Sequence, residues 1–159
     1  MIKMPGEDFY TFREYMTKDN EISASAQDYL EMIYRLSREA GYTRIYDLAE
    51  ALNIQPPSAT KMVQKLAKLG LVNYKRYDVI FLSEKGKQMG SFLLERHETV
   101  QSFLMLIGIK EGLLEETEKI EHTISLSTLQ ALNKLLAFFA SKPRMLKEFH
   151  AFEDIQSRN

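Results

Sequence analysis

The chain has 159 residues, a formal net charge of −1, 45% hydrophobic residues and no cysteine. This composition is that of a globular protein with one or two small domains, and it excludes disulfides, a thiolate zinc site and a cysteine nucleophile. No apolar run approaches the ~18 residues of a membrane span, and the first residues lack the apolar stretch of a secretory signal. We therefore expect a cytoplasmic protein that does not contact a membrane.

The hydrophobic pattern predicts a mainly helical chain that begins with an appendage. Residues 1–22 form an N-terminal extension that could hold a short helix or a frayed end. Ser23 or Ser25 can cap the next helix, in which apolar residues recur at helical spacing until Gly41. A further helix is predicted over residues 43–52, because its apolar residues keep the same period.

The next segment predicts a third helix followed by a ribbon. Pro56 and Pro57 are tolerated in the first turn of a helix, which then runs through Leu69. Alternation of apolar and polar residues indicates two strands, at 71–77 and 79–82. Three helices followed by a two-stranded ribbon are the order of a winged helix-turn-helix domain, in which the third helix enters the major groove of DNA.

Charge and side-chain type favour the third helix as the DNA-contacting element. Residues 28–90 carry ten basic and seven acidic residues, whereas the flanking segments are acidic. Lysines at i, i+4 and i+7 can neutralise phosphates, and neighbouring hydroxyl and amide groups can meet base edges. A solvated lysine face would explain the lysines alone, but the element order favours DNA binding. The predicted DNA contacts are Ser58, Thr60, Lys61, Gln64, Lys65 and Lys68, with Lys75 and Arg76 on the wing.

The remainder of the chain is predicted to be helical. Ser83 can cap a long helix that continues to about Ile107. Further helices are expected at roughly 111–124, 126–140 and from Pro143 to about 156. These helices form a second part of the chain, separate from the predicted DNA-binding domain.

Acidic residues and histidines recur at spacings that place them on shared helix faces. The candidate metal ligands are Asp28, Glu31, His97, Glu118, Glu121 and His122. Four carboxylates and two imidazoles without sulfur suit one or two Mn²⁺ ions, although affinity order alone favours Cu²⁺ or Zn²⁺, so selectivity must come from geometry and metal availability. Each pair of residues alone also fits an ordinary solvated surface.

Four sequence segments together carry a resemblance to a known family. Ser25–Tyr34, Pro57–Leu66, Arg96–Glu98 and Ile120–His122 resemble the manganese transport regulator branch of the diphtheria toxin repressor family. The resemblance covers roughly residues 23–156. It implies a homodimer that binds operator DNA when loaded with Mn²⁺ and represses manganese-uptake genes.

The resemblance also assigns roles to residues. The family's metal ligands fall on the six candidates, and oxygen donors stand at Asp28 and Glu118, where the iron-sensing branch has methionine and cysteine. Thr123 departs from the pattern, because manganese regulators have a second histidine there; that residue is not a ligand in the family. The SH3-like third domain of iron-sensing members is not expected. The implied domains are a winged helix-turn-helix domain over residues 23–90 and a helical metal-binding and dimerisation domain over residues 91–159.

Two other functions fit parts of the sequence. A winged-helix regulator could sense a small molecule without metal, in which case the six candidate ligands would be surface residues. Carboxylate and histidine pairs could also activate water in a dinuclear hydrolase. The sequence has no nucleophile motif and no phosphate-binding glycine loop, so we do not expect an enzyme. Titration of DNA binding with and without Mn²⁺ separates the three hypotheses.

Overall fold

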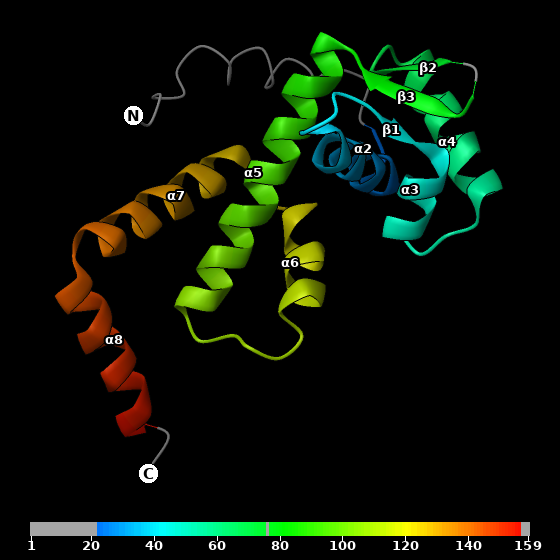
Figure 1. Cartoon of the computed structure of the whole chain (residues 1–159). Helices are drawn as coiled ribbons and strands as arrows, with labels where there is room; N and C mark the ends of the chain where they lie inside the picture. Colours follow the sequence, from blue (N-terminus) through cyan, green and yellow to red (C-terminus); the bar gives the residue numbers. More distant parts are fainter. Residues whose placement is uncertain (1–21, 76, 157–159) are drawn as a thin grey trace. The chain divides into compact units, whose positions relative to one another are not determined.

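The computed structural model describes residues 22–75 and 77–156 (Figure 1). The predicted N-terminal extension lies, except for Ile22, outside the described residues, as does Arg76. The chain divides into two compact units, one ending at Leu94 and the other beginning at Glu95. No helix in the described part of the chain is long and apolar enough to cross a membrane.

From Ile22 onward the first unit contains three helices before its sheet is complete, and their ends follow local signals. They are α2 (Ala24–Ser37), α3 (Ile45–Ala51) and α4 (Pro56–Lys68). Of the two predicted caps for α2, Ser23 is used, because its Oγ accepts a hydrogen bond from the Ala26 amide at 3.2 Å. Gly41 has φ +79° and donates its amide to the Ser37 carbonyl, which closes the end of α2.

The sheet has three strands, one more than the sequence indicated. The strands β1 (Thr43–Arg44), β2 (Val72–Lys75) and β3 (Val79–Leu82) are antiparallel in the order β1-β3-β2. The prediction of helix from residue 43 was therefore wrong for two residues. Thr43 pairs with Ile80 and is buried, because the open edge of β3 offers ladder hydrogen bonds that the local helical pattern does not reveal.

Apolar side chains from α2, α3, α4 and the sheet form the core of the first unit. Its fully buried members include Leu30, Ile33, Leu48, Val63, Leu66, Leu71 and Ile80. Burial of each large aliphatic side chain contributes roughly 1.5–3 kcal/mol. This core fixes α4 against the sheet and leaves the opposite face of α4 to solvent.

A long helix, α5 (Glu84–Leu106), begins in the first unit and continues into the second. Ser83 precedes it as predicted, and its Oγ accepts the Gly86 amide at 3.0 Å. The same Oγ lies 2.7 Å from the Gly70 carbonyl oxygen and 3.0 Å from that of Leu71. Gly86 packs so closely that an added Cβ would lie 1.9 Å from the Leu71 carbonyl oxygen, so only glycine fits there.

The second unit consists of helices. After α5 come α6 (Leu113–Glu121), α7 (Leu126–Ser141) and α8 (Pro143–Gln156). The helix predicted to reach residue 124 ends at Glu121, and His122 is its C-cap. Buried Leu129 anchors α7, whereas large apolar side chains of α7 and α8 remain exposed, among them Leu135, Phe138, Met145 and Phe152.

Candidate DNA-binding face and metal centre

The two faces of α4 differ as the sequence predicted. Ala59, Val63 and Leu66 are buried. The exposed face carries Ser58, Lys61, Gln64, Lys65 and Lys68. Thr60 differs from these predicted contacts, because it is half-buried and its hydroxyl donates to the Pro56 carbonyl at 3.1 Å. The solvent face of α4 is therefore basic and rich in donors, which suits phosphate and base contacts.

The wing is the hairpin of β2 and β3. Lys75 is the last residue of β2, but neither its side chain nor Arg76 is among the features that the structure describes. Tyr77 follows and is 85% exposed. The predicted contacts on the wing thus stay predictions, whereas the hairpin that would carry them is present.

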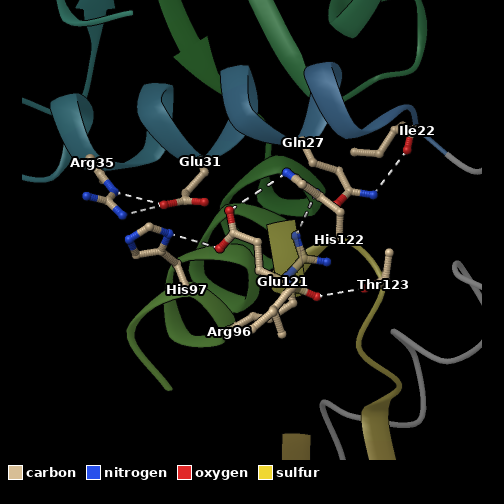
Figure 2. Close-up of polar contacts among 10 residues, drawn as sticks. Ile22, Gln27, Glu31, Arg35, Arg96, His97, Glu121, His122 and Thr123 are labelled. Atoms are coloured by element: carbon tan, nitrogen blue, oxygen red, sulfur yellow. Dashed lines mark hydrogen bonds and ion pairs between the residues drawn. The ribbon is translucent and has the colours of Figure 1, made fainter. Parts of the chain in front are cut away.

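His97 and Glu121 form a buried pair in the second unit. His97 lies in the middle of α5 and Glu121 ends α6. His97 Nδ1 is 2.9 Å from Glu121 Oε2, and Figure 2 shows the imidazole directed at the carboxylate. Glu121 is 1% exposed and His97 is 7% exposed, so this interaction is almost completely removed from water.

His122 extends the same group. Its Nε2 is 3.8 Å from Glu121 Oε1, and its Nδ1 is 3.4 Å from an Nη of Arg96. Figure 2 shows His122 between these two side chains. Because a guanidinium only donates hydrogen bonds, Nδ1 of His122 is the acceptor. The other ring nitrogen of His122, Nε2, faces Glu121. The two histidines thus approach different oxygens of one carboxylate.

The remaining candidate ligands are distributed over α2 and α6. Asp28 and Glu31 are three residues apart on α2, and Glu31 is buried and paired with Arg35 through Oε1. Glu118 is exposed and makes no hydrogen bond or ion pair with the residues that the structure describes. The structure thus brings His97, Glu121 and His122 together and leaves Glu118 at the surface.

The chemistry of this group fits a divalent metal ion. A buried carboxylate is costly unless a cation or hydrogen-bond donors face it. Glu121 is faced by two imidazoles, whose nitrogen atoms can also bind metal. Carboxylate oxygen and imidazole nitrogen without sulfur are ligands that Mn²⁺ accepts. Within this unit, His97, Glu121 and His122 are therefore the residues that would hold an ion.

The first unit is a winged helix-turn-helix, and the helical unit that follows holds a buried group of carboxylate and imidazole side chains. Together they define a metal-dependent transcriptional regulator. The family described as iron dependent repressor, N-terminal DNA binding domain, matches residues 21–80. The family described as iron dependent repressor, metal binding and dimerisation domain, matches residues 83–150. The chain belongs to the iron-dependent repressor family, which confirms the resemblance seen in the sequence.

Named relatives agree with this assignment. The HTH-type transcriptional regulator MntR of Geobacillus kaustophilus (strain HTA426) is 41% identical over 136 residues, covering 85% of this chain and 94% of that protein. The protein of the same name from Listeria monocytogenes serotype 4a (strain HCC23) is 41% identical over 130 residues, covering 81% of this chain and 92% of that protein. These relatives are transcriptional regulators, so the chain is a metal-dependent repressor of the MntR type and not an enzyme.

Solved structures show the same fold. The structure of the manganese regulator SloR aligns with a TM-score of 0.63 and 30% identity, covering 71% of this chain and 54% of that chain. The structure of ScaR with bound Zn²⁺ aligns with a TM-score of 0.59 and 28% identity, with the same coverage. The chain therefore spans about half the length of these two structural relatives.

Two arginines beside the candidate ligands were not found by sequence reasoning. Arg35 follows Glu31 by four residues, a spacing at which opposite charges pair on a helix. That signal was available in the sequence. Arg96, 3% exposed, contacts a histidine 26 residues further along the chain, and no local pattern could have revealed that pairing.

Proposed function

We propose that this repressor responds to Mn²⁺, binds operator DNA in the cytoplasm as a metal-loaded homodimer, and controls manganese-uptake genes. The MntR-type relatives and the structural likeness to a manganese regulator support Mn²⁺ as the regulating metal. The absence of cysteine supports it as well, because an oxygen and nitrogen donor set favours harder ions than a thiolate site does.

The proposed ligands are Asp28, Glu31, His97, Glu118, Glu121 and His122, serving one or two ions per chain. The observation that carries this proposal is the buried group in the second unit, in which His97 and His122 approach opposite oxygens of Glu121. Glu31 supports it too, because its carboxylate is buried and Arg35 orients it through Oε1.

The proposed ligands come from two parts of the chain, and this division suggests how metal regulates DNA binding. Asp28 and Glu31 belong to the same compact unit as α4, whereas the other four belong to the dimerisation unit. We propose that Mn²⁺ takes ligands from both groups, so that metal occupancy and DNA affinity are coupled. Repulsion among four carboxylates opposes the DNA-binding state without metal. A coupling of ~1–3 kcal/mol suffices for a several-fold to hundredfold change in affinity.

The DNA contacts proposed are the exposed residues of α4 together with the wing. Its lysines would bind phosphates, and Ser58 and Gln64 are placed on the exposed face where they could meet bases. A homodimer would present two such helices to a pseudo-palindromic duplex. The exposed apolar side chains of α7 and α8 support dimerisation through the second unit, since such surfaces commonly mark protein interfaces.

The experiment that tests this function is a DNA-binding titration of the full chain with and without Mn²⁺. A duplex selected by the protein from a random-sequence pool in the presence of Mn²⁺ serves as the probe. We expect binding that depends on Mn²⁺ and is lost when Glu121 and His122 are both replaced by alanine. Operator affinity independent of Mn²⁺ would contradict the proposal and favour the metal-independent regulator instead.

A further inference from the structure

The turn at the tip of the wing has an unusual backbone. Lys75 pairs with Val79, so three residues connect β2 to β3. Two of them in succession, Tyr77 with φ +68° and Asp78 with φ +59°, adopt left-handed conformations although neither is glycine. Aspartate tolerates this region, but tyrosine does so reluctantly. Such conformations persist where surrounding contacts hold them, and they concentrate at functional sites.

Contacts from two other elements hold this turn. The Tyr74 hydroxyl, on β2, donates a hydrogen bond to Asp78 Oδ1 at 2.8 Å. The amide of Ile45, at the start of α3, donates to the Asp78 carbonyl oxygen at 3.0 Å. Asp78 is therefore fixed through both its side chain and its backbone, directly after the exposed Tyr77.

Strand β2, which carries Tyr74, packs against α4, the helix that we propose enters the major groove. The Tyr74 hydroxyl donates to Asp78, whereas the Thr60 hydroxyl of α4 donates to the Pro56 carbonyl oxygen. Burial raises the pKa of Tyr74, the hydrogen bond to Asp78 raises it further, and Thr60 lowers it. The Tyr74 hydroxyl thus binds the wing turn from a strand that packs against the recognition helix.

Asp78 is negatively charged, so its position at the tip of the wing cannot be explained by attraction to DNA. A carboxylate at the tip of a wing repels the phosphates that the wing approaches. Its observed partners are instead the Tyr74 hydroxyl and the Ile45 amide. Asp78 therefore shapes the turn, and its charge is a cost to DNA affinity that the shaping must outweigh.

We propose that Tyr74 is a positioning residue for DNA binding. Its hydroxyl holds Asp78 of the wing turn, and its strand packs against α4, so that the wing is set relative to the recognition helix. Both elements can then meet one duplex without rearranging when DNA binds, which reduces the cost of association. The role rests on the proposed DNA-binding function. It deepens that function, because it assigns a purpose to residues that need not touch DNA themselves.

The test compares Tyr74→Phe, Asp78→Asn, Asp78→Ala and the Tyr74→Phe/Asp78→Ala double variant, with the selected duplex and saturating Mn²⁺. Tyr74→Phe should weaken binding about fivefold to tenfold, as expected for one hydrogen bond. Hydroxyl-radical footprinting should show that protection of the flanks contacted by the wing is lost while protection by α4 remains. Asp78→Asn should bind at least as tightly as the wild type, because its amide oxygen still accepts the bond and a repulsive charge is gone.

The double variant should bind no more weakly than the weaker single variant, since both remove the same interaction. Tyr34→Phe is the matched control, because it removes the hydroxyl of another half-buried tyrosine of the same unit. Wild-type affinity and footprint in Tyr74→Phe would overturn the proposal, as would strictly additive losses. Should Asp78→Ala fail to fold, Tyr74→Phe and Asp78→Asn still decide. Failure of the wild type to bind DNA with Mn²⁺ would overturn the proposed function itself, and this role with it.

Discussion

The imidazole of His97 and the carboxylate of Glu121 face each other at 2.9 Å in a place that water scarcely reaches. A buried negative charge is costly in free energy unless a positive charge lies next to it. Protonation of the imidazole supplies one, and a divalent ion supplies a stronger one. The pair is therefore the part of the second unit where metal binding should have its largest effect on stability.

Glu121→Gln should abolish most of the Mn²⁺ binding and leave the metal-free protein as stable as the wild type or more so. The amide preserves volume and hydrogen bonding but removes the buried charge. Mn²⁺ at a hundredfold excess over its dissociation constant should stabilise the wild type by ~2.7 kcal/mol and the variant by almost nothing. Thermal unfolding with and without Mn²⁺ measures this.

Glu115→Gln on the same helix is the control, because the exposed Glu115 pairs with Lys119, a contact that lowers its pKa. It should respond to Mn²⁺ like the wild type. Equal Mn²⁺ stabilisation of the Glu121 variant and the wild type would remove Glu121 from the ligand set.

Arg35→Ala should weaken Mn²⁺ binding by about tenfold or more, the size of effect found for residues that orient metal ligands. Arg35 contacts Oε1 of Glu31 through two nitrogens, and thereby directs the carboxylate. Isothermal titration with Mn²⁺ gives the affinity. Arg38→Ala removes the same charge three residues later on the exposed surface, and it should leave the affinity unchanged; an equal loss in both variants would mean that only net charge matters.

Lys61→Ala and Lys65→Ala should each weaken binding to every duplex and flatten the salt dependence. The logarithmic slope should fall by about 0.9 for each lost phosphate contact. Ser58→Ala or Gln64→Ala should instead alter sequence preference with little change in slope. Lys142→Ala, an exposed lysine of the other unit, serves as the control. Unaltered DNA binding in all the α4 variants would show that another element contacts the major groove.

Asp28→Met should broaden the metal response. A thioether is softer than a carboxylate and favours Fe²⁺ or Co²⁺ over Mn²⁺. We expect the variant to bind operator DNA with Fe²⁺ or Co²⁺ at concentrations where the wild type responds chiefly to Mn²⁺. DNA-binding titrations with each ion measure this, and a wild-type metal response in the variant would exclude Asp28 from control of selectivity.

Stability at high pH should depend on Tyr74, because burial and the hydrogen bond to Asp78 raise its folded-state pKa above the ordinary tyrosine value of 10.0. The folded state then holds the phenolic proton more tightly than the unfolded chain does. The resulting stabilisation is fully present below pH 10 and is lost as pH rises through the folded-state pKa. The difference in unfolding free energy between the wild type and Tyr74→Phe, followed from pH 8 to 11.5, should therefore shrink above pH 10. A constant difference would contradict the shift.

Much of the first unit could be predicted because its signals are local. The prolines that open α4, the glycine after it and the alternation of β2 and β3 each act within a few residues. Strand β1 was missed because its partner lies far along the chain, with Thr43 opposite Ile80. A strand of two residues is too short to show an alternating pattern. The helical pattern of α3 was therefore extended over these residues.

The candidate ligands could be proposed from spacing and resemblance, but their surroundings could not. Helical spacing predicts that Glu118 and Glu121 share a helix face, yet one is exposed and the other buried, because burial depends on what packs against the helix. The contact of Arg96 with His122 likewise arises from the approach of two helices. The division of the six ligands between ions stays a prediction.

The Ser83 hydroxyl links the end of the recognition helix to the start of α5, and this has a consequence for folding kinetics. Its partners Gly70 and Leu71 lie only 13 and 12 residues earlier in the chain, so the loop closed by these bonds is short and its closure entropy small. Contacts of low sequence separation form quickly. The wing hairpin and the first turn of α5 should therefore form early as one local nucleus, onto which the helices of the first unit condense.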